Sequence, residues 1–288
     1  MFQLCIDIGG TKTAFGLLNS EGVLVWSDRM LTRKGVGGLR GMVQEILRVI
    51  PKQISSVIGI AVPGKLCGPR YHVVPGTGVQ LGDLEDLSLL DIFEPMLPNG
   101  FSLFLINDAL AQFAGGLLQL GLNRFKNNKV VYLGPGTGLG GGVAWVSPTG
   151  IIEFHTDGHF FDVLVPDEKS AGWVMAEDVL SGRGILEHGG VDISLLTQAF
   201  VSLILQIHAG KFLKAKDPWA EADYACVKGT TDFVIGGSIG TKLEGLFESV
   251  SQALPDFIRL YCIPDSDVAA LTGLGFLRNQ DASLTCDN

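Results

Sequence analysis

Two aspartates lie close to the ends of apolar, strand-like runs in this 288-residue sequence. Asp7 comes just before a Gly-Gly-Thr turn, and Asp108 follows Asn107 after a later run. An aspartate in a glycine loop is suited to Mg²⁺, which prefers one or two carboxylates together with water and phosphate oxygens. An aspartate after a buried strand can accept the proton of a substrate hydroxyl, while Asn107 binds a neighbouring hydroxyl. These residues predict phosphoryl transfer to an alcohol, which depends mainly on positioning and charge stabilisation.

Three glycine-rich loops could bring backbone N–H groups close to phosphate oxygens, because glycine has no Cβ to hold a phosphate away. The first follows Asp7, the second lies between Gly134 and Gly142, and the third follows the apolar run that ends at Ile235. Threonine hydroxyls in the first two loops add hydrogen-bond donors. The predicted nucleotide-binding residues are Gly9, Gly10, Thr11, Lys12, Thr13, Gly136, Thr137, Gly138, Gly236 and Gly237.

Each of these features has a simpler structural interpretation. A Gly-Gly-Thr turn occurs in many hairpins, and Gly236-Gly237 could be an ordinary tight turn. An Asn-Asp pair before a helix is more often an N-cap than a catalytic base. The joint occurrence of all three in this order, each at the end of an apolar run, favours the phosphoryl-transfer interpretation.

A repeated strand, glycine turn and strand must position these residues. Phe2–Ile8 and Thr13–Leu18 flank the first loop, and Val130–Leu133 and Val143–Val146 flank the second. Each glycine loop leads into another strand-like run, whereas the glycine loop of a dinucleotide-binding fold leads into a helix. The repeat therefore predicts a duplicated domain and excludes a Rossmann dehydrogenase.

Apolar periodicity predicts the remaining elements. We expect further strands over Val23–Asp28, Ile54–Val62, Leu103–Ile106 and Asp232–Ile235, helices over Gly41–Ile50, Ala109–Leu120, Ser170–Leu180 and Ile193–Leu213, and a closing element over Val268–Leu277.

The composition is that of a globular protein with a sizeable core, since 47% of residues are hydrophobic and 18% are charged. A net charge of −9 and the lack of a Lys/Arg cluster argue against nucleic acid or an anionic membrane as partner. The five cysteines are scattered without metal-binding spacing, and the amino terminus lacks a signal-peptide pattern. We expect a soluble, cytoplasmic protein, with a composition compatible with a homodimer.

The ordered motifs resemble those of the actin/heat-shock-70/hexokinase superfamily, and specifically the ROK family and the similar bacterial glucokinases. The resemblance covers essentially the whole chain. The motifs that carry it are the phosphate loops Asp7–Thr13 and Gly134–Gly140, the connecting motif Asn107–Ala109 with Ala114–Gly116, the adenosine motif Ile235–Ile239 and the last connecting segment Ala269–Gly273.

This resemblance implies a two-lobed α/β fold of ribonuclease H-like duplicated domains with an ATP cleft between them. Residues 1–115, joined by the C-terminal helix at about 266–288, would form the small lobe, and residues 116–265 the large lobe. The implied activity is ATP-dependent phosphorylation of a sugar hydroxyl, as in glucokinase. Asp108 would be the general base and Asp7 would hold Mg²⁺.

The sugar-binding motifs match less closely. Where the family has Glu-x-Gly-His, this chain has Thr156-Asp157-Gly158-His159, so His159 matches and Asp157 is a shifted candidate for the glutamate. Glu177, before a Leu-Ser-Gly turn, resembles the second sugar-binding glutamate. Both residues also have a structural interpretation: His159 could be a core histidine, and Glu177 could lie on a solvated helix face. The family's sugar loop is replaced by a segment in which Thr77 or Gln80 would supply a donor, which leaves the acceptor sugar open.

The family's zinc-binding cysteines are absent from residues 160–176, so we expect no structural zinc. A catalytically weak, sugar- or nucleotide-binding regulatory protein of the same fold remains an alternative. A repressor is disfavoured because the chain opens on the phosphate-loop strand without a basic DNA-binding helix. An ATPase that activates a partner enzyme, or an acyl-CoA reductase, would need iron–sulfur cysteines that the sequence lacks.

Overall fold

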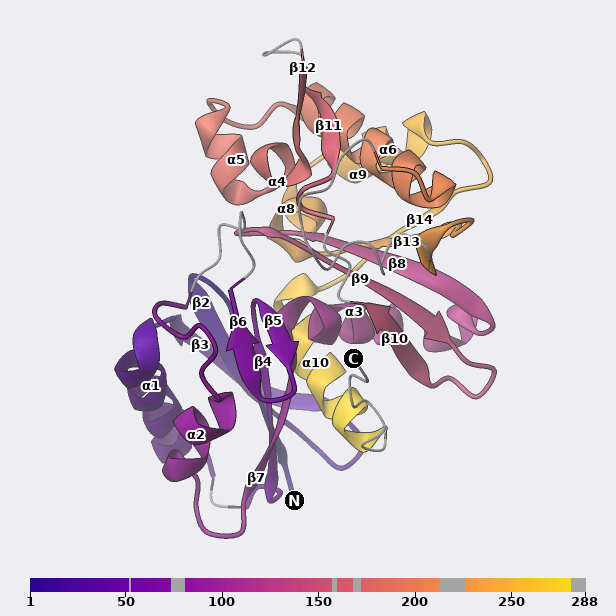
Figure 1. Ribbon diagram of the computed structural model, residues 1–288. Coiled ribbons are helices and arrows are strands. Elements are labelled where there is room, and N and C mark those ends of the chain that lie inside the picture. Colours follow the sequence, from indigo (N-terminus) through magenta and orange to yellow (C-terminus); the bar gives the residue numbers. More distant parts are fainter. Residues whose placement is uncertain (52, 74–80, 157–159, 168–171, 213–225, 281–288) are drawn as a thin grey trace. The chain divides into compact units, whose positions relative to one another are not determined.

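The computed structural model describes residues 1–51, 53–73, 81–156, 160–167, 172–212 and 226–280. The chain divides into two units, each with its own sheet (Figure 1). The first unit comprises the described residues of 1–115 and 268–280, and the second comprises those of 116–267. None of the described helices is long and apolar enough to cross a membrane.

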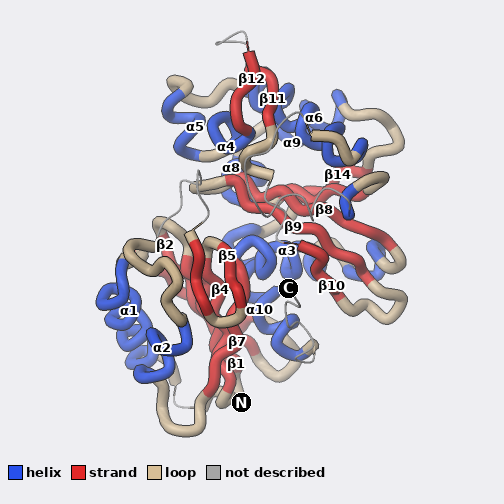
Figure 2. Tube along the Cα trace, in the orientation of Figure 1, coloured by secondary structure: helices blue, strands red, loops and turns tan. Residues whose placement is uncertain are grey.

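The first unit contains a five-stranded mixed sheet in the order β3-β2-β1-β4-β7. β1 pairs antiparallel with β2, β2 pairs antiparallel with β3, and β1, β4 and β7 run parallel. Figure 2 draws the strands of this unit in red and its helices in blue. The strands are β1 (Gln3–Ile8), β2 (Lys12–Leu18), β3 (Leu24–Leu31), β4 (Val57–Val62) and β7 (Ser102–Asn107). The apolar runs of the sequence therefore form strands, with bounds shifted by one to three residues.

Helices cover both faces of this sheet. α1 (Gly35–Val49) packs Leu39, Met42 and Ile46 against the face that carries Ile6 and Ile8 of β1. On the other face, Leu274 of α10 approaches Gly59 of β4, as expected for a strand whose successive side chains point to opposite faces. Smaller elements complete the first unit: β5 (Lys65–Cys67), β6 (Arg70–His72), α2 (Leu89–Phe93) and the 3₁₀ turn Glu94–Met96.

Two helices that are far apart in the sequence make close backbone contact in the first unit. They are α3 (Asp108–Gln119) and α10 (Ser266–Asn279). A Cβ on Gly115 would lie 1.8 Å from the Ala269 carbonyl oxygen, and one on Gly273 would lie 1.9 Å from that of Ala111. Only glycine fits at these two contacts. The small residues of the two connecting motifs thus serve close helix packing.

The second unit repeats the topology of the first. Its sheet has the order β10-β9-β8-β13-β14. β9 pairs antiparallel with both β8 and β10, whereas β8, β13 and β14 run parallel. The strands are β8 (Asn128–Pro135), β9 (Leu139–Val146), β10 (Ile152–Thr156), β13 (Asp232–Ile235) and β14 (Arg259–Cys262). The predicted domain duplication is confirmed at the level of strand order and direction.

The other elements of the second unit include a two-stranded hairpin that pattern reasoning did not predict. The expected helix over Ser170–Leu180 is wrong in its first half, because Gly172–Met175 is strand β12, paired with β11 (Leu164–Asp167). The helices are α4 (Ala176–Leu180), α5 (Gly182–Glu187), α6 (Ile193–Ala209), α8 (Gly237–Lys242), α9 (Leu246–Ala253) and the 3₁₀ turn Leu122–Phe125.

Candidate active site

Asp7 and Asp108 lie at the same edge of the first-unit sheet. Asp7 of β1 is in register with Ala61 of β4, and Val62 of β4 is in register with Asn107 of β7. Since β1, β4 and β7 are parallel, their carboxyl ends meet at one edge, which is the usual place for ligand-binding residues in such sheets. Asp108 begins α3 directly after β7.

The two carboxyl groups influence each other electrostatically. Burial, together with the smaller effect of the Asp108 charge, raises the pKa of Asp7 to about 8. Burial also raises the pKa of Asp108 to about 6, against the opposing effect of the Ala109 N–H, which donates to Asp108 Oδ1 at 2.8 Å. A proton or a cation on Asp7 therefore stabilises this site.

Asp7 has the features expected of a cation ligand. Its Oδ1 is buried and has no hydrogen-bond partner among the residues that the structure describes, and an orphaned carboxylate oxygen of this kind gains most from a cation. Among the described residues, no three His, Cys, Asp or Glu side chains form a metal-binding group. A Mg²⁺ ion at Asp7 would therefore complete its coordination with phosphate oxygens and water, as Mg²⁺ commonly does.

Asn107, predicted to bind substrate, is the N-cap of α3. Its Oδ1 accepts the Leu110 N–H at 3.1 Å, and its Nδ2 donates to the Gly64 carbonyl oxygen at 2.8 Å. The capping interpretation therefore holds for Asn107. By fixing both the helix start and the turn at Gly64, Asn107 positions Asp108.

The first glycine loop is held by a threonine that the sequence did not single out. Within the loop, the Gly9 N–H donates to Lys12 O at 3.0 Å. Thr32, just after β3, donates its hydroxyl to Gly9 O at 2.7 Å and its N–H to Thr11 O at 3.0 Å. The Thr13 hydroxyl is fully buried and hydrogen-bonds that of Thr32 at 2.9 Å.

The predicted phosphate-binding residues of this loop therefore divide into two groups. Thr13 supports the loop from inside, whereas Thr11 and Lys12 are exposed and Gly9 and Gly10 are half-buried.

The second glycine loop is held by a buried carboxylate. The Gly136 N–H donates to Gly138 O at 2.8 Å, which closes the loop tip. Glu177 is fully buried, and its Oε2 accepts the Leu139 N–H at 2.7 Å. Thr137 at the tip is exposed, and Gly136 and Gly138 are half-buried. One oxygen of the predicted sugar ligand Glu177 is thus committed to the loop.

The third glycine loop and the Ser181-Gly182 turn both contact the second loop within the second unit. The Gly182 N–H donates to Gly136 O at 2.8 Å, and the Gly236 N–H donates to Leu133 O at 2.9 Å. Gly237 has φ +67°, and a Cβ there would lie 2.1 Å from Pro135 O. Only glycine meets both conditions, so three glycine turns from distant segments form one cluster.

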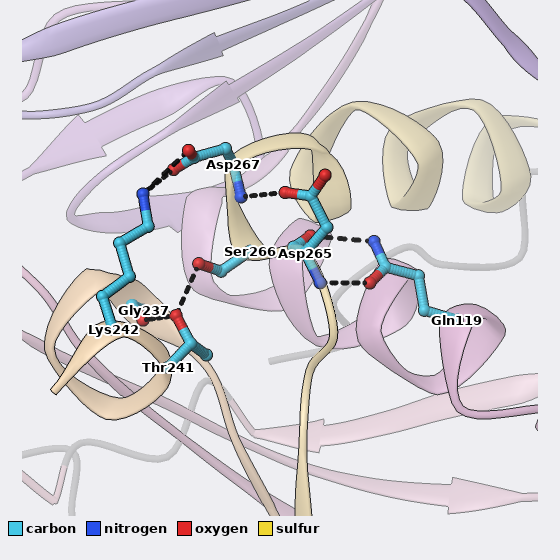
Figure 3. A network of polar contacts seen from close by, with 7 residues as sticks. All are labelled: Gln119, Gly237, Thr241, Lys242, Asp265, Ser266 and Asp267. Carbon is cyan, nitrogen blue, oxygen red and sulfur yellow. Dashed lines mark hydrogen bonds and ion pairs between the residues drawn. The ribbon is translucent and has the colours of Figure 1, made fainter. Parts of the chain in front are cut away.

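A polar network anchors α8, which follows the third glycine loop, to the start of α10 (Figure 3). Thr241 donates to Gly237 O at 2.7 Å and hydrogen-bonds the Ser266 hydroxyl at 2.9 Å. Lys242 pairs with Asp267 at 2.7 Å. Gln119, at the end of α3, exchanges two hydrogen bonds of 2.9 Å with the backbone of Asp265. The network fixes the backbone that carries Gly236-Gly237.

The other predicted sugar-binding residues, Asp157, His159 and Thr77, lie outside the described residues. Sequence reasoning missed Thr32, Gly182 and Tyr132, whose ring lies against both Gly134 and Gly236. Gly182 stood in the Leu-Ser-Gly turn next to Glu177 and could have been found there. Thr32 and Tyr132 carry no local signal, because their contacts exist only in the fold.

No protein-family model matches the sequence. Over 141 residues the chain is 28% identical to the N-acetylmannosamine kinase of Yersinia pestis (strain Pestoides F), a stretch covering 49% of this chain and 46% of that protein. The match thus spans about half the length of this curated relative.

Solved structures match over nearly the whole chain. A ROK family glucokinase from Streptomyces griseus, in complex with glucose and AMPPNP, has a TM-score of 0.66 at 18% identity, covering 98% of this chain and all of that one. A ROK family transcriptional regulator, a homolog of the E. coli MLC protein, has a TM-score of 0.62 at 14% identity, covering 96% and 79%. The predicted resemblance to ROK proteins and the predicted fold class are confirmed.

Proposed function

We propose that this protein, which has the fold of the ROK sugar kinases, transfers the γ-phosphoryl group of ATP to a sugar hydroxyl. The observation that carries the proposal is the pair of carboxyl groups Asp7 and Asp108, which share one edge of the first-unit sheet and have raised pKa values. The proposed activity agrees with that of the kinases that the chain resembles, an N-acetylmannosamine kinase and a glucokinase.

Asp108 is the proposed general base. With a pKa of about 6 it is mostly ionised at neutral pH yet basic enough to take a proton, which is the property a general base needs. The acceptor hydroxyl gives its proton to the Asp108 carboxylate, its oxygen bonds to the γ-phosphorus, and the bond from that phosphorus to the β,γ-bridging oxygen breaks to release ADP. Asn107 holds the Asp108 backbone through the helix cap and the bond to Gly64.

The glycine loops are the proposed nucleotide site. Asp7 would hold Mg²⁺, which when bound neutralises phosphate charge in this reaction. Gly9, Gly10, Thr11 and Lys12 would bind phosphate through backbone N–H groups and exposed side chains. In the second unit, the clustered turns at Gly136, Gly182 and Gly237 would hold the rest of the nucleotide. We therefore assign proton abstraction to Asp108 of the first unit and nucleotide binding to the glycine turns.

The acceptor class that we propose is a hexose or an N-acyl amino sugar. Glucose and N-acetylmannosamine appear in the names of the similar proteins. His159, Asp157 and Thr77 would line the sugar site. Glu177 would serve the nucleotide site instead of the sugar, by holding the second glycine loop through the Leu139 N–H.

A sugar-binding regulatory protein is the second candidate. It is favoured by the likeness to a ROK transcriptional regulator at a TM-score of 0.62, and by Asn107, whose amide is engaged in structural hydrogen bonds. Regulation by a sugar requires only binding, whereas the kinase requires turnover, so one screen distinguishes the two.

The test is a coupled assay of ATP consumption across aldohexoses, amino sugars, ketoses and polyols, with Mg²⁺. We expect sustained ADP release with at least one sugar. In parallel, calorimetry should detect Mg²⁺-dependent ATP binding that weakens in Asp7→Asn but not in Asp28→Asn, a control at an exposed position of β3. Sugar binding without ADP release would favour the regulatory protein, and equal ATP affinity with and without Mg²⁺ would remove Asp7 from the site.

A further inference from the structure

Tyr71 of β6 carries its hydroxyl at the same sheet edge as Asp108. The side chain is fully buried. A Cβ on Gly64 would lie 2.8 Å from Tyr71 Cε2 and 3.0 Å from Cζ, the atom that bears the hydroxyl. Gly64 has φ +101° and follows β4, so the hydroxyl end of the ring lies over the turn at the carboxyl end of that strand.

Hydrogen bonding links this turn to the proposed catalytic base. The Gly64 carbonyl oxygen accepts the Asn107 amide at 2.8 Å, and Asp108 is the next residue. Burial, together with the smaller effect of the Asp108 charge, raises the pKa of Tyr71 to about 12. The phenol therefore stays neutral at physiological pH and retains its hydrogen as a donor.

The Tyr71 hydroxyl is buried and, within the described part of the chain, its hydrogen has no acceptor, although the Leu81 N–H lies toward the phenol oxygen. A buried polar group without a partner costs free energy, and packing alone would be met by phenylalanine. Asp7 Oδ1 is buried and unpartnered as well, and Asp7 and Tyr71 both have Asp108 as an electrostatic neighbour. Unsatisfied groups therefore gather around the residue proposed to do the chemistry.

We propose that Tyr71 binds the acceptor, donating its hydroxyl hydrogen to a second oxygen of the same sugar whose hydroxyl Asp108 deprotonates. This inference rests on the proposed function and deepens it, because it names a specificity-determining residue outside the motifs of the sequence. A neutral donor at this place selects an uncharged polyol with an oxygen within its reach. An acceptor that lacks this oxygen leaves the hydroxyl buried and unpaired, and is discriminated against for that reason.

The test compares Tyr71→Phe with Tyr261→Phe. Tyr261 is a matched control because its hydroxyl has a partner, Asp232 Oδ1 at 3.2 Å, in the second unit. Steady-state kinetics with ATP, Mg²⁺ and either glucose or N-acetylmannosamine give kcat and KM. Thermal unfolding of both variants, with and without each sugar, separates stability from binding.

Tyr71→Phe should raise the KM for the better sugar about three- to tenfold, the range of one neutral hydrogen bond, with kcat within about twofold. Its melting temperature without sugar should equal or exceed that of the parent, since an unpaired buried hydroxyl is removed. Tyr261→Phe should show the reverse pattern, a lower melting temperature and an unchanged KM.

An unchanged sugar KM in Tyr71→Phe, or a loss of stability like that of Tyr261→Phe, would overturn the proposal and make the hydroxyl structural. If the parent protein turns over neither sugar, the kinase proposal fails for these acceptors. The Tyr71 proposal is then decided by the sugar-induced shift in melting temperature. Loss of that shift in Tyr71→Phe supports the proposal, whereas an equal shift in the variant, or none in the parent, overturns it.

Discussion

The two glycine hairpins share a strand topology but are held by different chemistry. Each joins the first two antiparallel strands of a five-stranded sheet with the same strand order, and each closes through one N–H to carbonyl bond inside the loop. The first hairpin is supported by neutral hydroxyls, those of Thr32 and Thr13. The second is supported by the buried carboxylate of Glu177, 38 residues away in the sequence.

The sheet edges differ in the same way. In the first unit, the acids Asp7 and Asp108 lie at the sheet edge, and the hydroxyls that hold the loop are neutral. In the second unit, the sheet edge carries clustered glycine turns, and the charged group is the buried Glu177 that holds the loop. The two units thus share a backbone topology but differ in the side chains that this topology positions. We expect substitutions of acids in the first unit to change rate and pH response, and substitutions of supports to change stability.

The largest expected effect is on catalysis in the first unit. Asp108→Asn keeps size and the contact with the Ala109 N–H but removes basicity, so kcat should fall about 10²–10⁴-fold. If the transition state is loose, the acceptor hydroxyl loses its proton late in the reaction, and the fall in kcat should lie near the lower end of this range. Affinities for sugar and ATP should be nearly unchanged, as for an interaction made only in the transition state.

Steady-state kinetics and equilibrium binding would check this split between kcat and affinity. If Asp108→Asn turns over at the parental rate, Asp108 is not the general base and serves only at the start of α3. In the parent, kcat should fall as the pH drops through about 6, because protonated Asp108 cannot act as a base.

Asp7→Asn should stabilise the apo protein in a pH-dependent way. The folded-state pKa of Asp7 is about 8 and the ordinary value is 3.8. Its contribution to stability is therefore fully present below about pH 4 and is lost as the pH rises through 8. Because asparagine does not ionise, the variant should gain on the parent across this window, on the order of a few kcal/mol at pH 8.

Chemical denaturation at pH 4.5 and pH 8, without Mg²⁺ or nucleotide, measures this difference. Asp28→Asn is the control, because Asp28 is exposed on β3 of the same unit. A difference between Asp7→Asn and the parent that is equal at both pH values would show that Asp7 is ionised in the folded protein.

Glu177→Gln tests the charged support of the second hairpin. Glutamine can still accept the Leu139 N–H, but the hydrogen bond loses its charge assistance. We expect a loss of about 1–2 kcal/mol in unfolding free energy and weaker ATP binding, with the sugar KM unchanged. Glu187→Gln, an exposed substitution on α5, is the control. A weaker sugar affinity with intact ATP affinity would instead assign Glu177 to the sugar site.

Much of the fold could be predicted from local patterns, and the supports of the site could not. Apolar runs ending in glycines located β1, β8 and β13, and the run that returns after the first glycine turn located β2, because strand length and turn chemistry are encoded locally. The helix expected at Ser170 was wrong because Gly172–Met175 pairs with β11 instead. Short β14, with its partly buried and exposed pattern, gave no alternation to detect.

The candidate site shows the same division. Asp7, Asp108 and the glycine loops could be found because their residue types and spacing carry chemistry. The bond from Thr32 to Gly9, the bond from Asn107 to the Gly64 turn beside Tyr71, and the bond from Glu177 to Leu139 join residues 23 to 43 positions apart, which no local window contains. Whether a polar residue supports a loop or binds a ligand depends on its hydrogen-bond partners, and those are set by the tertiary fold.

Thr32→Val gives the smallest expected effect and the sharpest test of the contrast between the hairpins. Valine keeps the shape of threonine but cannot donate to Gly9 O or bond to Thr13, so two neutral hydrogen bonds are lost. We expect about 1 kcal/mol lower unfolding free energy and a few-fold weaker ATP binding, with no change in the pH dependence of stability, since no charge is involved. Thr149→Val removes a comparable part-buried hydroxyl contact, to Ser147 in the second unit, and should leave ATP binding unchanged. Calorimetry and denaturation of both variants measure these effects.

One outcome would contradict this prediction: Thr32→Val lowers stability no more than Thr149→Val does and leaves ATP affinity intact. The hydroxyls then do not hold the first loop, and its geometry is set by the backbone bonds from Gly9 to Lys12 and from Thr32 to Thr11 alone.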